Sequence, residues 1–221
     1  MRVVIMGGTS GIGLAAAERL SAEGADVVVT GRRPATVKVA SEVVDGTDET
    51  QVKEFFDRFG EFDHLVLAFS PGPAGMGPLK DTPSDGIRTA FGKVFGYLAA
   101  IRHARVTGSI TMISAATARA ALPGTAALAG ANGALERMAS PLAAELAPVR
   151  VNVVAPGVID TPWWSFLPEE QKQAQFTGAA EGLAVKRVGR AEDVAEAISY
   201  LVNASYVTGT ILPVDGGFTV A

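Results

Sequence analysis

The sequence predicts an α/β fold in which one doubly wound parallel β-sheet carries helices on both faces. Short β-branched runs, such as 2–6 and 150–154, have the composition of strands that are buried on both faces. They alternate along the chain with longer segments of helical composition. Glycine and proline clusters separate the two kinds of segment, and no internal repeat or low-complexity linker interrupts them.

The length and composition favour a single domain, residues 1–221, with one well-buried core. The net charge is −4 and there is no lysine-rich or arginine-rich block, so we expect no nucleic-acid partner. The absence of cysteine excludes disulfides, thiol nucleophiles and thiolate metal sites. With His64 and His103 as the only histidines, we expect no metal centre.

The N-terminus enters its first strand at once and shows no signal-peptide pattern. The uncharged stretch 120–135 follows Arg119, and prolines and glycines break it, so it is too short and too broken to span a bilayer. We therefore expect a cytoplasmic protein that has no membrane partner.

Each element follows from its local pattern. The first helix is expected to end at Glu23, before Gly24. Between the second and third strands we expect only a stub of helix, because the connection is short. Thr47 is the expected N-cap of a helix with the apolar stripe Val52, Phe55, Phe56 and Phe59, and Thr82 the N-cap of the next. The expected strands are 2–6, 27–30, 39–44, 64–69, 109–114, 150–154 and 209–214, and the later helices are 82–102, 125–146 and 191–202.

The segment Gly7 to Gly13, GGTSGIG, lies between the first strand and the first helix and predicts a phosphate-binding loop. Gly7, Gly11 and Gly13 allow a tight turn, a close approach of the backbone to phosphate and close packing of helix on sheet. Thr9 and Ser10 place hydroxyls at the helix N-terminus, which favours an anion. The alternative is a tight strand-to-helix turn without a ligand.

The second strand ends in Gly31-Arg32-Arg33-Pro34. An acidic residue at this point suits the ribose 2′-hydroxyl of NAD, whereas arginine suits the 2′-phosphate of NADP. Two arginines without an acid favour NADP(H) over NAD(H). The alternative is a pair of solvated loop arginines.

Residues 162–187 have no clear partner strand and are interpreted as a substrate lid. Trp163, Trp164 and Phe166 would close over an apolar or aromatic small-molecule substrate, or else pack in an oligomer contact. The helix at 125–146 is rich in alanine and glycine, so another helix could approach it closely. We expect a homodimer or homotetramer.

Four segments in this order resemble the short-chain dehydrogenase/reductase family and cover nearly the whole chain. They are GGTSGIG at 7–13, Asp45-Gly46-Thr47-Asp48, RVNVVAPG at 150–157 with Thr161 after it, and VTGTILPVDGG at 207–217. The resemblance implies a Rossmann-type, seven-stranded parallel sheet with NAD(P) lying across its carboxyl edge.

The family pattern also implies roles for individual residues. Two departures stand out: Met6 replaces the usual threonine, and 67–70 read Leu-Ala-Phe-Ser where the family has Asn-Asn-Ala-Gly. The resemblance implies that backbone contacts of Ala68, Phe69 and Ser70 to the cofactor could survive this change, whereas the side-chain hydrogen bonds that brace the strand could not. The resemblance places Gly7, Thr9, Ser10, Gly11, Ile12 and Gly13 at the pyrophosphate and adjoining ribose, Arg32 and Arg33 at the 2′-phosphate, Asp45 and Gly46 at the adenine, and Pro156, Gly157, Ile159 and Thr161 at the nicotinamide.

The larger departure concerns catalysis. The family uses a serine, a tyrosine and a lysine, and the matching positions here are Ala115, Leu128 and Asn132. The family's supporting asparagine corresponds to Lys93. A positioned general acid contributes roughly 10²- to 10⁴-fold in rate. Its loss would therefore slow redox chemistry without excluding it.

The proton would then come from Lys93, Ser114, Arg119, the substrate itself or water. The alternatives are that Lys93 is a plain helix-surface lysine, that Ser114 points into the other face of the sheet and that Arg119 is solvated. We expect an NADP(H)-dependent oxidoreductase with an atypical active site that acts on a small, mainly apolar carbonyl or imine compound. A non-redox cyclase or isomerase and a nucleotide-binding sensor or silent subunit are the alternatives.

Overall fold

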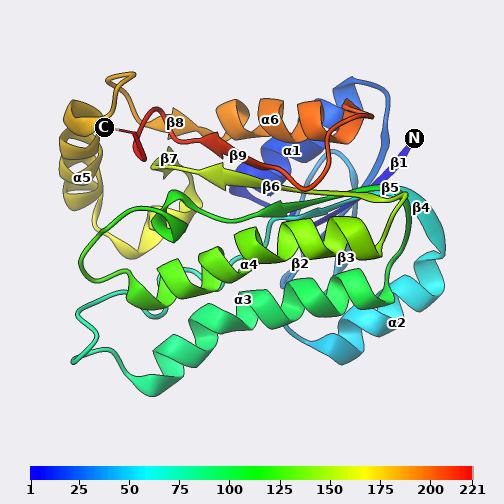
Figure 1. Ribbon diagram of the computed structural model, residues 1–221, viewed down its shortest axis with the longest axis horizontal. Coiled ribbons are helices and arrows are strands. Elements are labelled where there is room, and N and C mark those ends of the chain that lie inside the picture. The colour runs from blue at the N-terminus through cyan, green and yellow to red at the C-terminus, as the bar shows by residue number, and fades with distance from the viewer. Residues whose placement is uncertain (221) are drawn as a thin grey trace.

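The computed structural model describes residues 1–220 and contains a seven-stranded sheet between two layers of helices (Figure 1). The strand order is β3-β2-β1-β4-β5-β6-β9, and every neighbouring pair is parallel. This confirms the predicted α/β class and the single Rossmann-type sheet. The strands are β1 (Arg2–Met6), β2 (Asp26–Gly31), β3 (Ala40–Val43), β4 (Glu61–Leu67), β5 (Arg105–Ile113), β6 (Arg150–Pro156) and β9 (Ile211–Val214).

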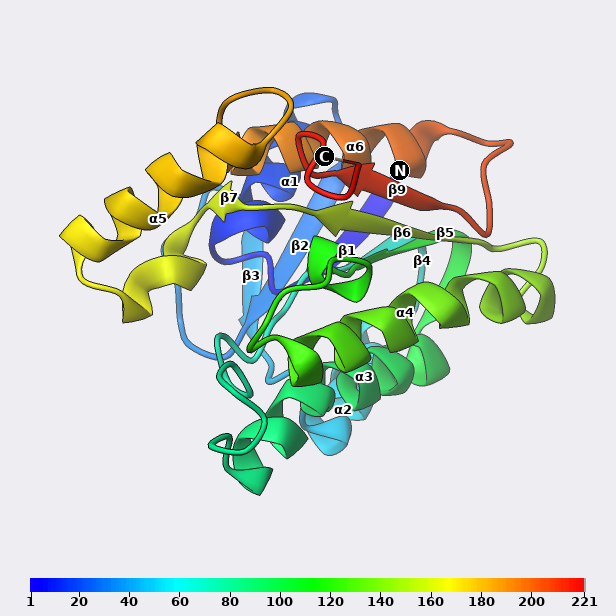
Figure 2. The same ribbon diagram turned by 60° about the vertical axis from the view of Figure 1, so that its left-hand side comes forward.

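Helices α1 (Gly11–Ala22) and α6 (Ala191–Asn203) cover one face of the sheet. The other face packs against α2 (Glu49–Phe59), α3 (Ser84–His103) and α4 (Ala126–Glu145) (Figures 1 and 2). Because β1 is buried on both faces, its alternate side chains enter two separate apolar cores, with Val3 and Ile5 in one and Val4 and Met6 in the other.

The carboxyl edge of the sheet carries the remaining elements. Two 3₁₀ turns, η1 (Ala116–Ala118) and η2 (Pro162–Phe166), follow β5 and β6, and α5 (Glu169–Gly182) comes after η2. A two-residue parallel pair, β7 (Ile159–Asp160) with β8 (Gly189–Arg190), joins the chain just before η2 to the chain after α5. The strand order reverses between β1 and β4, which is where ligands bind in open α/β sheets.

Three local predictions were wrong. The described chain has no helix between β2 and β3, because only residues 32–39 connect them and Pro34 lies among these. Asp48, not Thr47, caps α2, since its carboxylate accepts hydrogen bonds from the Thr50 and Gln51 amides. Helix α3 begins at Ser84, one residue later than a Thr82 cap requires, and the Thr82 hydroxyl donates to the Pro78 carbonyl instead.

The aromatic stripe of α2 was predicted correctly: Val52, Phe55 and Phe56 are buried and Phe59 packs against them. His103 near the end of α3 contacts Glu49, with 3.0 Å between its Nε2 and the Glu49 Oε1. No helix within residues 1–220 is long and apolar enough to cross a membrane.

Candidate functional site

The loop after β1 is pressed against β4 and against the start of α1. Gly7 has φ +84°, and a Cβ built on it would lie 2.4 Å from the Phe69 backbone nitrogen. A Cβ built on Gly13 would lie 2.2 Å from the Gly7 carbonyl oxygen. A side chain at either position would therefore collide with backbone, and glycine is required at both.

The loop presents unpaired backbone N–H groups at the N-terminus of α1. The Gly7 and Gly8 amides are already used, since both donate to the Thr30 carbonyl at 2.9 and 3.1 Å. The amides in the first turn of a helix, here Gly11, Ile12 and Gly13, have no intrahelical acceptor. Ser10 is the N-cap, and its side chain makes no capping hydrogen bond. Free amides and the positive end of the helix dipole fit a phosphate group.

The end of β2 lies next to this loop. A Cβ on Gly31 would lie 2.4 Å from the Thr9 Oγ1, so the Thr9 side chain packs directly on that glycine. Arg32 and Arg33 follow and are exposed. Neither has an ion pair or a side-chain hydrogen bond within residues 1–220, whereas Arg19 and Arg58 are both paired. Two unpaired guanidinium groups at this point can bind a phosphate by donating hydrogen bonds to it.

The residues predicted at the nicotinamide approach the same loop from β6. The Gly157 amide donates to the Val214 carbonyl at 3.1 Å, and Ile159 is buried. A Cβ on Gly11 would be 3.4 Å from the Thr161 Cβ. The fold thus brings the predicted pyrophosphate residues and the predicted nicotinamide residues together, although 150 positions separate Gly11 from Thr161.

Phe69, two residues after the end of β4, fills a space left by two glycines. Its ring atoms would lie 2.6 Å from a Cβ on Gly46 and 2.9 Å from a Cβ on Gly96. The ring also packs edge-on against Tyr97 with 4.7 Å between centroids. Gly46, predicted beside the adenine, is therefore buried under Phe69. The neighbouring Asp45 carboxylate accepts hydrogen bonds from the Thr47 amide and hydroxyl at 2.9 and 2.8 Å.

Tyr97 supplies a brace between β4 and β5 that the sequence of β4 lacks. Its Oη lies 3.3 Å from both the Phe69 and the Ile113 carbonyl oxygens. Burial raises the pKa of Tyr97 well above its ordinary value, so the phenol stays protonated and can donate. The adjacent Ala68 amide donates to the Met6 carbonyl at 2.8 Å, and the Ser70 hydroxyl accepts from Gly72. The carboxyl ends of β1, β4 and β5 are thereby tied together.

Lys93 is buried between α3 and α4 and is not a helix-surface lysine. Only 7% of the residue is exposed, and its Nζ donates to the Asn132 Oδ1 at 3.0 Å. The Asn132 Nδ2 donates in turn to the Leu128 carbonyl at 2.9 Å and to the Thr117 Oγ1 at 3.3 Å. Burial lowers the pKa of Lys93 to about 7, so the amine can exchange a proton near neutral pH.

Ser114 and Arg119 meet at a buried carboxylate on α4. The Ser114 hydroxyl donates to the Glu136 Oε1 at 2.9 Å, and the Arg119 Nε lies 3.5 Å from the Glu136 Oε2. Ser114 and Glu136 are 4% and 7% exposed, whereas one third of the Arg119 side chain is accessible. The hydrogen of Ser114 is therefore committed to Glu136, and Arg119 is only partly solvated.

The segment 162–187 packs at the carboxyl edge around an aromatic cluster. Trp163, Trp164 and Phe166 in η2 contact one another, and Trp164 also packs edge-on against Phe176 of α5. The Trp164 Nε1 donates to the Ile159 carbonyl at 2.9 Å, which anchors the cluster to β7. Lys172 of α5 adds an ion pair with Asp160, 2.9 Å between Nζ and Oδ1.

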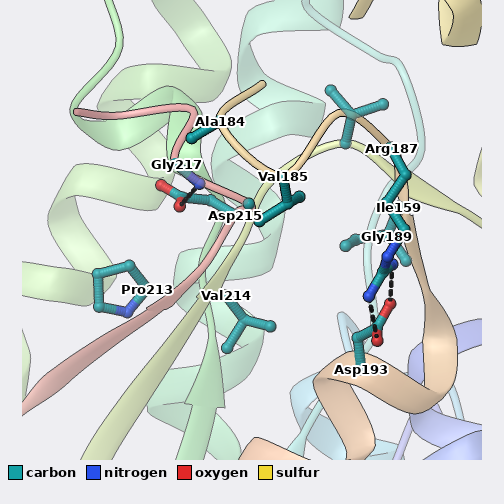
Figure 3. A pocket seen from close by; sticks show the side chains of 12 residues that line it. Ile159, Ala184, Val185, Arg187, Gly189, Asp193, Pro213, Val214, Asp215 and Gly217 are labelled. Atoms are coloured by element: carbon teal, nitrogen blue, oxygen red, sulfur yellow. Dashed lines mark hydrogen bonds and ion pairs between the residues drawn. The ribbon is translucent and has the colours of Figure 1, made fainter. Parts of the chain in front are cut away.

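A cavity of about 520 Å³ lies between the turn after β6, the end of β9 and the loop before β8 (Figure 3). At its polar end Arg187 makes two hydrogen bonds to Asp193, which lower the pKa of that carboxyl to about 2. Lys93, Ser114, Thr117 and Asn132 are not among the lining residues. The apolar lining comes from Val158, Ile159, Ala184, Val185, Pro213 and Val214.

A family model described as Enoyl-(Acyl carrier protein) reductase matches residues 7–219. Short-chain dehydrogenase/reductase ATR9 of Stachybotrys chlorohalonatus is 30% identical, over 97% of this chain and 95% of that protein. This chain belongs to the short-chain dehydrogenase/reductase family.

Other relatives support the assignment. The 3-oxoacyl-[acyl-carrier-protein] reductase MabA of Mycobacterium bovis is 33% identical over 97% of this chain and 91% of its own length. The crystal structure of a small-chain dehydrogenase in complex with NADPH superposes with a TM-score of 0.91. It shares 33% identity and covers 100% of this chain and 99% of the other.

Three polar residues at the carboxyl edge of this short-chain dehydrogenase/reductase were not predicted from the sequence. Glu136 could have been found, because it follows Leu128 and Asn132 at successive four-residue steps along one face of α4. Tyr97 lies four residues after Lys93 on α3 and could have been found in the same way. Thr117 carries no local signal. Among residues 1–220, no group of three potential His, Cys, Asp or Glu metal ligands occurs.

Proposed function

We propose that this chain is an NADP(H)-dependent oxidoreductase that reduces a small, mainly apolar carbonyl or imine compound with a non-standard proton source. The observation that carries the proposal is the junction of β1, β2 and β4. There, free amides at the N-terminus of α1 lie beside the end of β2, where Arg32 and Arg33 are unpaired. The MabA relative is named as a reductase and the superposed structure holds NADPH, which supports the same cofactor.

The residues present fit this cofactor. The Gly11, Ile12 and Gly13 amides would hold the pyrophosphate, and the Arg32 and Arg33 guanidiniums the 2′-phosphate. Gly157, Ile159 and Thr161 would hold the nicotinamide end. When bound, reduced nicotinamide supplies a hydride, and the protein's part is to bind, orient and protonate.

Of the proposed proton sources, Lys93 has the most suitable acidity. An amine with a pKa of about 7 is both charged and able to give up its proton at neutral pH. Ser114 is held by Glu136, and an arginine does not deprotonate in proteins. Because Lys93 is buried, it can act on the substrate only through neighbouring groups, which would relay either its proton or the polarising effect of its charge.

A mainly apolar substrate is supported by the cavity in Figure 3 and by the aromatic cluster of η2. The cavity shares Ile159 with the proposed nicotinamide site, so an apolar group could extend from one into the other. Under the same proposal the aromatic cluster belongs to a substrate lid at 162–187.

The test is NADPH consumption against a panel of apolar ketones, aldehydes and cyclic imines. We expect turnover of at least one class, with oxidation of NADPH matched by reduced product. Product formation without any change in cofactor absorbance would instead identify a cyclase or isomerase. Tight NADPH binding without turnover of any compound would leave a sensor or silent subunit as the function.

The cofactor preference has its own prediction. Replacing Arg32 and Arg33 together with alanine should weaken NADPH binding by about 10- to 100-fold, since hydrogen bonds to charged groups contribute roughly 1.5–3 kcal/mol. NADH binding should change little, because NADH has no 2′-phosphate. Fluorescence titration with both cofactors measures the difference.

The exposed Arg88 of α3, changed to alanine, is the matched control and should leave both affinities unaltered. An equal loss of NADPH and NADH affinity in the Arg32/Arg33 variant would show that these arginines do not recognise the 2′-phosphate.

We also propose that the chain acts as a homodimer or homotetramer through α3 and α4. Helix α4 presents alanines and glycines, and on α3 Phe95 is 68% exposed and Leu98 37%. Burying such side chains against a second copy would remove apolar surface from water. Analytical ultracentrifugation measures the state directly.

A further inference from the structure

A hydrogen-bond chain runs from the interior to the carboxyl edge of the sheet. It begins at the Lys93 Nζ on α3, passes through the Asn132 amide on α4 and ends at the Thr117 Oγ1 in η1. Lys93 and Asn132 are 7% and 6% exposed, whereas Thr117 is half-buried. Thr117 lies two residues after Ala115, which occupies the position of the family's serine.

The donors and acceptors of this chain can be assigned from chemistry alone. The Leu128 carbonyl can only accept, so the Nδ2 of Asn132 must face it, and the Oδ1 must face the Lys93 amine. The second hydrogen on Nδ2 points to the Thr117 oxygen. That oxygen accepts, and the hydrogen of its own hydroxyl has no acceptor within residues 1–220.

We propose that Thr117 donates this hydrogen to the carbonyl oxygen of the substrate, and that Lys93 and Asn132 are positioning residues that act through it. The inference rests on the proposed reductase function. Thr117 would then supply the hydroxyl that Ala115 lacks. In a poorly solvated interior each hydrogen bond polarises the next, so a charged amine at one end makes the terminal hydroxyl a better donor.

Besides the cofactor, this reduction needs one water molecule as the proton source. Reduced nicotinamide, when bound, would supply a hydride to the carbonyl carbon, and the π electron pair of the C=O bond would move onto oxygen. The Thr117 hydrogen bond strengthens as that oxygen gains charge, so it stabilises the transition state more than the bound ketone. The resulting alkoxide would take its proton from a water molecule, so that the products are an alcohol, a hydroxide ion and oxidised nicotinamide.

The test compares Thr117→Val with Thr117→Ser, using a ketone or aldehyde that the wild-type enzyme reduces. Valine keeps the shape and removes the hydroxyl, and should lower kcat by about 10²-fold, as loss of one oxyanion donor does, with little change in KM. Serine keeps the hydroxyl and should retain kcat within a few-fold. Because all three residues form one chain, adding Asn132→Leu to Thr117→Val should cause little further loss of kcat.

Thr125→Val is the matched control, since the Thr125 hydroxyl donates to the Leu122 carbonyl and has no place in the chain. Its kcat should equal that of the wild type. A Thr117→Val enzyme with normal kcat, or a Thr117→Ser enzyme as slow as the valine variant, would overturn the inference while the reductase function stands. If the wild type reduces no compound, the proposed function and the inference fall together.

Discussion

Replacing Gly46 with alanine is expected to lower the free energy of unfolding by about 1–3 kcal/mol, the usual cost of overpacking. The new Cβ would lie 2.6–2.8 Å from three ring atoms of Phe69. The backbone at Gly46 is not left-handed, so an alanine there is strained by the ring and not by its own conformation. Urea unfolding measures the loss.

The same substitution should be tolerated when Phe69 is also alanine. The ring is then gone, and a glycine-to-alanine change at a compatible position is neutral or stabilises by about 0.4–1 kcal/mol. Phe69→Ala alone will cost stability, because it leaves a space between Gly46, Gly96 and Tyr97. The double variant should therefore lose less unfolding free energy than the two single variants lose together, by about 1–3 kcal/mol.

Two other glycines make the comparison specific. A Cβ on Gly96 would lie 2.2 Å from the Gly46 carbonyl oxygen as well as against Phe69, so Phe69→Ala should not rescue Gly96→Ala. A Cβ on Gly92, on the same helix, would meet nothing within 4 Å. Gly92→Ala should stabilise α3 by about 0.5–1 kcal/mol. If the losses of unfolding free energy in Gly46→Ala and Phe69→Ala add up exactly in the double variant, the Phe69 ring does not occupy the space beside Gly46.

The fold and the glycine-rich turn between β1 and α1 could be predicted because their signals are local. A strand buried on both faces reads as an unbroken β-branched run, and the glycine spacing of 7–13 lies within a single turn. Where the signal depended on one residue, prediction was less accurate. Thr47 and Asp48 are both good caps, and only the carboxylate of Asp48 reaches the amides of the first turn.

The polar network could not be predicted in the same way, because its partners are far apart along the chain. Lys93 and Asn132 are 39 residues apart, and Tyr97 reaches the Phe69 carbonyl across 28. Lys93 is flanked by residues that suit a surface helix as well as a buried one. It is buried because α4 presents small side chains, Ala127 and Ala131 among them, which allow α3 to pack closely.

Burial of the Lys93 amine should make stability depend on pH in a way that a variant without the amine does not share. In the unfolded chain the pKa of this lysine is about 10.5, and in the folded protein burial lowers it to about 7. Below pH 7 both states hold the proton, and the cost of burying the charge is fully present. Between pH 7 and 10.5 only the unfolded state holds it, so the folded state gains stability as the pH rises.

The measured quantity is the difference in unfolding free energy between the wild type and Lys93→Met. From pH 7 to pH 9 it should shift in favour of the wild type by about 2–3 kcal/mol, since each pH unit contributes at most about 1.4 kcal/mol. At pH 6 the methionine variant avoids the buried charge but leaves the Asn132 Oδ1 unpaired, so its absolute stability reflects two opposing effects.

Lys93→Gln separates these two costs. Its amide can still donate to the Asn132 Oδ1, so its absolute stability should exceed that of Lys93→Met if the unpaired oxygen matters. Neither side chain titrates, so both variants should show the same shift against the wild type between pH 7 and pH 9. Parallel stability curves for all three proteins would mean that the Lys93 amine titrates as it would in water. Such an amine would be neither buried nor acidic enough to act at neutral pH, and Lys93 would lose its place in the proposed chemistry.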